Sequence, residues 1–286
     1  MIAVTGGTGF VGRHLIARLL REGERVRAFA RHPADLDGAE VIACDVTDEA
    51  PLAAAIRECS ALIHLVGIIE ETGEQTFDRV HVEGTRSVVG ACRSAGVSRL
   101  LYVSALGARP DARSHYHCSK WQAEECVRES SLAATIFRPS VIFGRGGGFV
   151  RQLREFIRTA RILPIVGSGT GLIQPIWVED VVSCLVVALR RQETVSETFE
   201  LGGPAAYGFE QLLDLVAEGE GLDLPKVHLP VSLAKLAVAV FSRLTPRFPI
   251  TPDQLTMLIE DNVCDIAKMR ETFGIEPADL QDHLSD

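Results

Sequence analysis

A tyrosine and a lysine stand one helical turn apart near the middle of the chain. The segment reads Tyr116-His117-Cys118-Ser119-Lys120 and begins a stretch of helical spacing. Residues i and i+4 share one face of a helix, so an ammonium at Lys120 would favour the phenolate of Tyr116 and lower its pKa. A tyrosine tuned in this way can exchange a proton with a carbonyl or an alcohol. By itself, the pair can also be an ordinary exposed helix pair.

A glycine-rich loop joins an apolar strand pattern at 2–5 to a helical pattern at 11–22. In full it reads Thr5-Gly6-Gly7-Thr8-Gly9-Phe10-Val11-Gly12. Gly6 would allow a tight turn, Gly9 the approach of a pyrophosphate, and Gly12 close packing of the helix. The N–H groups at the helix N-terminus would then bind the phosphates. The alternative is a turn that binds nothing and leaves those N–H groups to water.

The elements that would position these residues alternate along the first half of the chain. The expected strands are 2–5, 25–30, 40–44, 61–66, 99–104 and 134–137, and the expected helices are 11–22, 51–58, 77–95 and 116–129. Such repeats form a parallel sheet with helices on both faces. We therefore expect an α/β fold, a Rossmann-type doubly wound parallel sheet, over residues 1–145. Its ligand crevice would lie at the carboxyl ends of the strands, beside the glycine loop and Tyr116.

After Pro139 the alternation loosens. We expect helices at 149–161, 180–190, 209–218, 231–244, 252–259 and 266–273, and strands at 173–178 and 198–201. Residues 146–286 should form a smaller, mostly helical substrate or partner lobe, with 174–204 contributing in part to the first domain. The apolar stretch 231–244 could dock on a protein complex or a membrane surface. Burial against the small lobe is the alternative.

The end of the second strand bears on the choice of dinucleotide. Enzymes that use NAD place an acid there to bind the ribose hydroxyls. Arg31 occupies that position here, and no carboxylate appears before Asp35. A guanidinium binds a 2′-phosphate through two hydrogen bonds, so we expect NADP(H), with NAD(H) less favoured. Arg31 could instead be a solvated loop residue.

Two more strand ends carry candidate cofactor contacts. Asp45-Val46 closes the third strand, where the carboxylate can reach an adenine amino group or cap the following helix. Leu65-Val66-Gly67 ends the fourth strand, beside the expected path of the cofactor. Glu124 and Glu125 could do acid–base chemistry, but we expect a solvated helix face.

Composition excludes several classes of protein. The chain has 47% hydrophobic residues and a net charge of −9, so no nucleic-acid partner is expected. Seven cysteines without zinc spacing indicate reduced thiols, no metal and a cytoplasmic protein. An expected strand from Ile2 leaves no room for a signal peptide. Lys235 and Arg243 interrupt the stretch that comes nearest to a membrane span.

Together, the glycine loop, Asp45-Val46 and Tyr116-x-x-x-Lys120 resemble the short-chain dehydrogenase/reductase superfamily over nearly the whole chain. Other segments look like its extended and atypical branches, which are similar to NAD-dependent epimerases and dehydratases. The nearest resemblance is to the branch of the 39-kDa accessory subunit of respiratory NADH:quinone oxidoreductase. The segments that carry it are 102–108, 135–144 with Arg138-Pro139-Ser140, 174–180, 251–255 and 261–263.

The resemblance implies a site for the dinucleotide, with Lys120 bonding the nicotinamide ribose. With the loop residues, the expected contacts are Gly6, Thr8, Gly9, Phe10, Val11, Gly12, Arg31, Asp45, Val46, Leu65, Val66, Gly67, Tyr116, Lys120, Pro139 and Val141. Active members orient the substrate carbonyl with a Ser or Thr, usually the second residue of a Ser-Ser-like pair. Here the pair reads Ser104-Ala105, so Ser104 would have to take that role, and the family's usual Asn is His81.

Three functions fit these residues. The first is an NADP(H)-dependent oxidoreductase acting on a carbonyl or alcohol of a small molecule, with Tyr116, Lys120 and Ser104 as catalytic residues. The second is a non-catalytic NADP(H)-binding accessory, assembly or redox-sensing protein, peripheral to a membrane complex. The third is a nucleotide-sugar epimerase or dehydratase, which would need a diphosphate site, and the second half has arginines at 145, 151, 154, 158 and 161.

Overall fold

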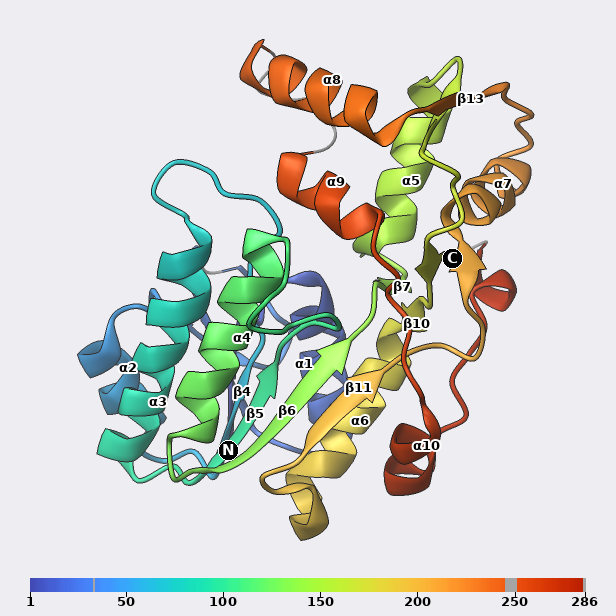
Figure 1. Cartoon of the computed structure of the whole chain (residues 1–286). Helices are drawn as coiled ribbons and strands as arrows, with labels where there is room; N and C mark the ends of the chain where they lie inside the picture. The colour runs from blue at the N-terminus through green and yellow to red at the C-terminus, as the bar shows by residue number, and fades with distance from the viewer. Residues whose placement is uncertain (33, 245–250, 285–286) are drawn as a thin grey trace.

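Seven strands form the central sheet of the computed structural model (Figure 1). They are β1 (Ile2–Thr5), β2 (Val26–Ala30), β3 (Glu40–Ala43), β4 (Ala61–His64), β5 (Arg99–Val103), β6 (Ala133–Pro139) and β11 (Thr198–Leu201). All pair in parallel, in the order β11-β6-β5-β4-β1-β2-β3. The expected doubly wound α/β fold is therefore confirmed. The structure describes residues 1–32, 34–244 and 251–284, apart from the side chains of 239–244.

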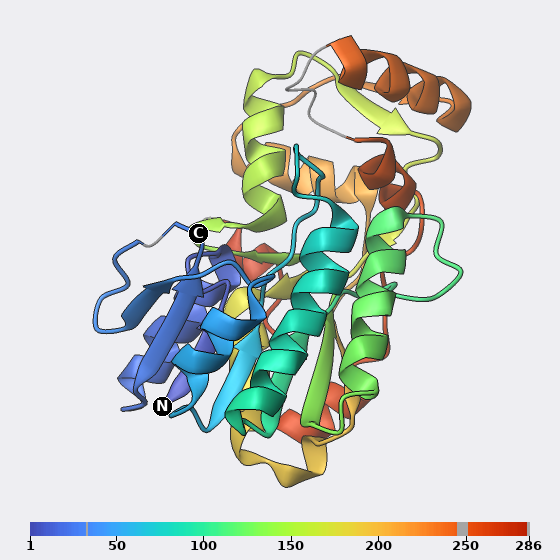
Figure 2. The same cartoon turned by 90° about the vertical axis from the view of Figure 1, so that its left-hand side faces the viewer.

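Helices cover both faces of this sheet. Figure 2 shows the layer formed by α2 (Glu49–Ile56), α3 (Gly84–Ala95) and α4 (His115–Arg128). The opposite face is covered by α1 (Phe10–Arg21) and α6 (Val178–Arg190). In α1, the buried side chains Leu15, Ile16 and Leu19 recur at helical spacing, so one apolar stripe faces the sheet.

The last α-helix of the described residues returns to the sheet. α10 (Ala267–Phe273) packs against α6 and β11, although it falls within the range 146–286 that we assigned to the smaller lobe. Met269 and Phe273 are buried, and the ring centroid of Phe273 lies 4.8 Å from that of Phe199 in β11. Their spacing of four places both on one helix face, which belongs to the sheet layer. The smaller lobe therefore excludes α10.

The smaller lobe combines helices with very short strands. Its helices are α5 (Gly148–Thr159), α7 (Phe209–Gly219), α8 (Val231–Leu244) and α9 (Pro252–Leu258). Its strand pairs are β7 (Ile142–Gly144) with β10 (Ile176–Trp177), β8 (Leu163–Val166) with β13 (Lys226–Leu229), and β9 (Leu172–Ile173) with β12 (Tyr207–Gly208). The strand expected at 173–178 is thus two strands, and the sequence pattern predicts none of β7, β8 and β13. β7 has only three residues, too few to show an alternating pattern, whereas β8 and β13 are defined by their pairing with each other.

Helix α8 has one covered face and one open face. Ala234 and Val238 are buried and cluster with Leu255 of α9. Leu233 and Leu236 are 50% and 61% exposed. The expected burial against the smaller lobe therefore holds in part over the described side chains, and docking through the open face stays a prediction. Among the described residues, no helix combines the length and the apolarity needed to cross a membrane.

A buried carboxylate joins α4 to β6. Glu124 is completely buried, which corrects the expectation of a solvated helix face. Its two oxygens accept hydrogen bonds from Arg138 at 2.8 and 2.7 Å, and Arg128 donates to it at 2.6 Å. A buried charge needs such partners because its removal from water is costly. The sequence spacing of Glu124 indicates Arg128 at i+4 but gives no sign of Arg138, because β6 supplies that residue.

Two adjacent glutamates test this ion pair. Glu124→Gln should lower the free energy of unfolding by about 3 kcal/mol, because the mostly buried Arg138 guanidinium keeps only the half-exposed Glu200, at 3.8 Å, as an ion-pair partner. Glu125→Gln is the control, since that side chain is 43% exposed and its bond to Arg128 contributes less than about 1 kcal/mol. Urea unfolding of both variants measures the difference. Equal losses would show that Glu124 is no more important than a surface charge.

Candidate functional site

The loops that follow the parallel strands meet at one edge of the sheet. Thr5, the last residue of β1, is paired with His64 at the end of β4. The strand order reverses between these two strands, and such a switch point is where α/β sheets open a ligand crevice. Gly6 lies at this point with a φ of +76°, and a Cβ there would approach the Leu65 carbonyl carbon to 3.1 Å. The sequence-predicted glycine loop and Leu65 are therefore neighbours.

The glycines of the loop have different surroundings. Gly12 is buried, and a Cβ there would lie 2.7 Å from the Gly7 carbonyl oxygen. Gly9 is exposed, and its Cβ would meet only the Gly6 oxygen, at 3.2 Å. The α1 helix begins at Phe10, so its first N–H groups have no acceptor within the helix. Gly12 thus serves packing, whereas the open side of Gly9 and these N–H groups suit an anionic ligand.

Two polar candidates lie on the loops after β2 and β3. Arg31 is exposed directly after β2. Asp45 uses one carboxylate oxygen to accept hydrogen bonds from the amide and hydroxyl of Thr47, both at 3.0 Å. The following helix has Asp48 at its N-cap, so Asp45 does not cap it. The carboxylate instead closes a local turn, as Asp side chains often do.

The remaining candidate contacts divide into core and surface residues. The Val46 and Pro139 side chains are buried, so these two residues can offer a ligand little apart from backbone groups. Leu65, Val66 and Val141 are half-buried, and Gly67 is exposed.

A second glycine-rich loop lies beside the first turn of α1. A Cβ on Gly147 would lie 2.8 Å from the Phe10 ring. His14 joins this loop to α6, since Nε2 lies 2.9 Å from the Arg145 carbonyl oxygen and Nδ1 lies 2.6 Å from Glu179. Sequence reasoning missed this contact, although the glycine run after residue 145 was its signal. The loop therefore forms a wall against Phe10 at the start of α1, next to the place where the sequence predicts phosphate binding.

Tyr116 and Lys120 lie on the first turns of α4, as their spacing predicts. The Lys120 side chain is almost completely buried. Its Nζ donates to the Val103 carbonyl oxygen at 2.8 Å and lies 4.7 Å from the centre of the Tyr102 ring. A Cβ on Gly67 would lie 3.8 Å from this nitrogen, so Lys120 reaches the exposed loop after β4.

The pKa of Tyr116 moves opposite to the sequence expectation. Burial raises the pKa of Tyr116 to about 12. Burial also lowers the pKa of Lys120 to about 7, against the opposing charge of Glu124. The same desolvation thus favours the neutral form of both groups, and the Lys120 charge that should stabilise a phenolate is itself weakened. The phenol is protonated at neutral pH, which is the form that can donate.

Ser104 does not reach Tyr116. Its hydroxyl is buried and has no hydrogen-bond partner among the described residues. The backbone N–H of Ser104 donates to the Phe137 carbonyl oxygen at 2.7 Å, which fixes the end of β5 beside β6. The structure therefore brings Tyr116 and Lys120 to the crevice but leaves the third expected catalytic hydroxyl inside the protein.

The N-terminus of α4 is held by the second lobe. The two oxygens of Asp253, in the first turn of α9, accept the N–H groups of His115 and Tyr116 at 2.8 and 3.0 Å. Ser114 caps the same end by accepting from His117. Figure 2 shows α9 above this end of α4. The segment 251–255, which carries part of the family resemblance, thus positions the helix that carries Tyr116.

A groove of about 470 Å³ opens beside Tyr116, a volume that suits a small molecule. The ring centroid of Phe77, in its wall, lies 5.8 Å from that of Tyr116. Its lining residues are Glu70, Glu71, Phe77, Arg113, His115, Thr251, Pro252, Asp253 and Thr256. In the described part of the chain, no group of three or more His, Cys, Asp or Glu side chains could hold a metal ion.

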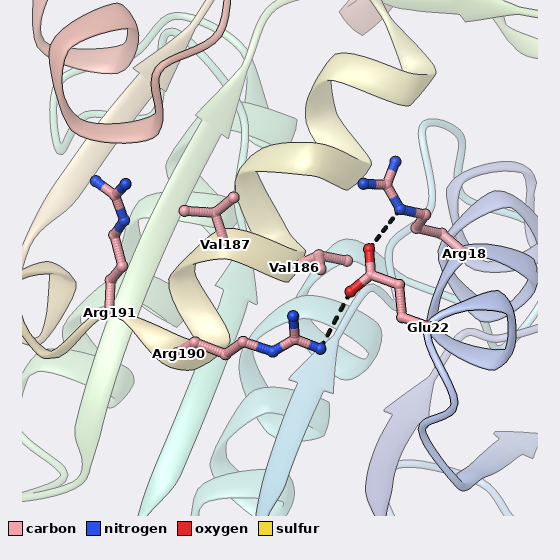
Figure 3. A pocket seen from close by; sticks show the side chains of 6 residues that line it. All are labelled: Arg18, Glu22, Val186, Val187, Arg190 and Arg191. Atoms are coloured by element: carbon pink, nitrogen blue, oxygen red, sulfur yellow. Dashed lines mark hydrogen bonds and ion pairs between the residues drawn. The ribbon is translucent and has the colours of Figure 1, made fainter.

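A second hollow, of about 330 Å³, lies far from these groups, between the C-terminal parts of α1 and α6 (Figure 3). Glu22 binds both Arg18, at 2.6 Å, and Arg190, at 3.1 Å. Its floor contains Val186 and Val187. Because its charges are paired and it holds no general acid, we place the site at the sheet edge instead.

The buried Lys120 should make stability depend on pH. In an unfolded chain the pKa of lysine is about 10.4. Between pH 7 and pH 10 the unfolded chain therefore binds more protons than the folded one, and stability rises with pH. Lys120→Met removes the titrating group, so the variant lacks this gain in stability. Its free energy of unfolding minus that of the wild type should therefore fall from pH 7 to pH 10. Urea midpoints at pH 6, 8 and 10 measure it, and a constant difference would contradict a depressed pKa.

Comparison with known proteins places the chain in a family. The sequence profile described as the NAD dependent epimerase/dehydratase family matches residues 2–202. Ceramide reductase of Caulobacter vibrioides is 35% identical over 196 residues, which cover 66% of this chain and 61% of that protein. NADH dehydrogenase (ubiquinone) 1 alpha subcomplex subunit 9, mitochondrial, of Arabidopsis thaliana is 29% identical over 273 residues, 91% of this chain and 68% of that protein.

A solved structure shows the same fold. MoeE5 in complex with UDP-glucuronic acid and NAD superposes with a TM-score of 0.78 at 21% identity, covering 99% of this chain and 96% of that one. The expected resemblance to the accessory-subunit branch is confirmed by the Arabidopsis relative. The chain belongs to the NAD dependent epimerase/dehydratase family, within the extended short-chain dehydrogenase/reductase superfamily.

Proposed function

We propose that the chain is an NADP(H)-dependent oxidoreductase that acts on a carbonyl or alcohol of a small molecule. The observation that carries this proposal is a half-buried Tyr116 one helical turn from a buried Lys120, beside the switch point of the sheet and next to a groove of substrate size. Residues 1–145 would bind the dinucleotide, and the smaller lobe would select the substrate. The ceramide reductase relative makes a lipid-like carbonyl compound our first choice.

The residues at the sheet edge fit a nicotinamide dinucleotide. The exposed Gly9 and the N–H groups that begin α1 would hold the pyrophosphate. Arg31 follows β2, which pairs with β1, and Asp45 follows β3, which pairs with β2, so both would face the adenosine end. Lys120, near Gly67, would bond the nicotinamide ribose. A bound dinucleotide of this kind supplies or accepts a hydride at a carbon atom.

The chain itself would handle the proton. The Tyr116 phenol, with its pKa raised to about 12 by burial, stays protonated and can donate to a carbonyl oxygen as that oxygen gains charge. A bond from the ribose to Lys120 would favour the ammonium, which would then stabilise the phenolate left behind. Phe77 and the groove wall would limit water around the reacting carbon. Ser104 has no part in this scheme, since its hydroxyl is enclosed.

Arg31 should decide the preference for NADPH. Arg31→Ala should raise the Kd of NADPH by about tenfold to a hundredfold, because charge-assisted hydrogen bonds to the 2′-phosphate are lost. The Kd of NADH should change by less than about twofold. Arg25→Ala, an exposed arginine before the other end of β2, is the matched control. Tighter binding of NADH than of NADPH by the wild type, or an unchanged Kd in Arg31→Ala, would show that the enzyme does not select the 2′-phosphate.

The second candidate is a non-catalytic accessory protein that binds the dinucleotide. The enclosed Ser104 hydroxyl favours it, because the site then lacks a group to orient a carbonyl. The relative from the NADH dehydrogenase complex is consistent with it. In this role Tyr116 and Lys120 would only bind the ribose, and the exposed Leu233 and Leu236 of α8 would offer a contact for a complex or a membrane. A cytoplasmic location beside a membrane stays our prediction.

Tyr116→Phe separates the two candidates. The wild type is assayed with NADPH against a ketone-bearing ceramide, a short-chain ubiquinone and UDP-glucose. If the chain is an oxidoreductase, one of the first two should oxidise NADPH, and Tyr116→Phe should lower kcat at least about a hundredfold while the Kd of NADPH stays within about threefold. Turnover that survives the substitution would exclude the proton donor. Tight NADPH binding without any turnover would favour the accessory role.

The nucleotide-sugar alternative gains no support from the charges of the second half. Arg151 pairs with Glu155 at 3.5 Å, and Arg154 and Arg158 both pair with Glu220. Arginines paired with carboxylates in this way are poorly placed to bind a diphosphate, since the carboxylates would repel it. UDP-glucose is therefore the substrate for which we expect no turnover.

A further inference from the structure

His81 lies at the centre of the site without a role in the chemistry above. It is completely buried in a π-helical turn, Asp78–Glu83, which begins the helix expected at 77–95. The Phe77 ring stacks on it with centroids 5.5 Å apart, and the edge contact of the Tyr116 ring is also at 5.5 Å. A Cβ on Gly67 would lie 3.5 Å from Nε2. Single π-helical turns occur often at functional sites, because the wider turn redirects a side chain.

The hydrogen bonds of His81 determine its tautomer. The N–H of Ile68 points at Nε2 over 3.0 Å, and since an amide can only donate, Nε2 must accept. The proton of the neutral ring therefore sits on Nδ1, which lies 2.8 Å from the Ser119 hydroxyl oxygen. Ser119 in turn donates to the Tyr116 carbonyl oxygen at 2.8 Å. Burial, with a smaller contribution from the charge of Lys120, lowers the pKa of His81 to about 2 and keeps the ring neutral.

These bonds form one directed chain between two walls of the site. It begins at the loop after β4, beside Gly67, and ends on the backbone of Tyr116 in α4. Each ring nitrogen of His81 has one hydrogen-bond partner, so the neutral ring needs no further donor or acceptor. An imidazolium would lose the Ile68 bond, because both nitrogens would then donate. A phenylalanine of similar size could fill the space, so packing alone does not require a histidine here.

We propose that His81, acting through Ser119, is a positioning residue that fixes Tyr116 relative to the Gly67–Ile68 backbone. The inference rests on the proposed function, in which Tyr116 donates a proton while Gly67 borders the nicotinamide ribose. The separation of these two groups sets the alignment of the proton donor with the bound dinucleotide. Small losses of such alignment reduce rates strongly.

The tautomer can be measured in the intact chain. Nitrogen-15 NMR of the histidine rings should show His81 protonated at Nδ1 and unprotonated at Nε2 from pH 5 to pH 8. His81→Asn assigns the signal by removing it. Protonation at Nε2, or at both nitrogens within this range, would reverse or break the chain of bonds and overturn the proposal.

Variants test whether the chain positions Tyr116. The sequence has three tyrosines, so the Cζ signal of Tyr116 can be assigned with Tyr116→Phe. Ser119→Ala and His81→Leu should each shift this signal and raise the Kd of NADPH by about tenfold, the effect of one lost hydrogen bond. His81→Asn keeps a donor near the place of Nδ1 and should bind NADPH within about threefold of the wild type.

The control has the same local geometry. Ser130 is a buried serine that follows the other end of α4, and it donates to the carbonyl oxygen three residues before it, as Ser119 does. Ser130→Ala should leave the Tyr116 signal and the Kd of NADPH unchanged. If Ser119→Ala behaves like Ser130→Ala, the positioning role is wrong, and this holds even where His81→Leu does not fold. If the wild type binds neither NADPH nor NADH, the proposed function fails, while the tautomer and the Tyr116 signal still decide on His81.

Discussion

The carboxyl ends of seven parallel strands all lie at the same edge of the sheet, and the site depends on that constraint. The glycine loop, the loop after β4 and the end of β5 are far apart in sequence, yet pairing of Thr5 with His64, and of His64 with Tyr102, makes them neighbours. The crossover helix α4 then starts at the same edge, because β5 ends there and the chain must return along α4 to the opposite edge before the parallel strand β6 begins. Tyr116 lies on its first turn for this reason.

Desolvation shapes the chemistry of that edge more than any single ion pair. Lys120 lies over the Tyr102 ring, and the Thr5 hydroxyl contacts the fully buried ring of His64 at 2.7 Å. Burial, and to a smaller extent the Lys120 charge, lowers the pKa of His64 to about 3. Burial thus favours the uncharged forms of His64, His81 and Lys120 at this edge of the sheet. A charge in this region is destabilised because it is removed from water. A substrate carbonyl that gains negative charge on accepting a hydride would form strong hydrogen bonds with the few donors present, because little water surrounds them.

Sequence patterns predict most of the fold and the outline of the site. Strands and helices of the first half follow from apolar runs and helical spacing, and glycine spacing indicates the turn between β1 and α1. The misses share one cause, which is that they depend on residues from elsewhere in the chain. Glu124 is buried because Arg138 comes from a neighbouring strand, and Tyr116 becomes a weaker acid because neighbouring elements exclude water. β13 was missed because its pairing with β8, rather than its own pattern, defines it.

A few hydrogen bonds connect the second lobe to the helix that carries Tyr116, the proposed proton donor. Asp253 binds the amides of His115 and Tyr116, so α9 forms part of the N-terminal cap of α4. Asn262 links the same segment to the loop after β5 by donating to the Leu106 carbonyl oxygen at 3.2 Å, and it accepts from Ser140 after β6 at 2.5 Å. A substrate seated in the groove would touch α9 and the start of α4 together. In the proposed function, selection of the substrate and placement of Tyr116 would therefore depend on the same contacts, and a segment remote in sequence from the glycine loop would belong to the site.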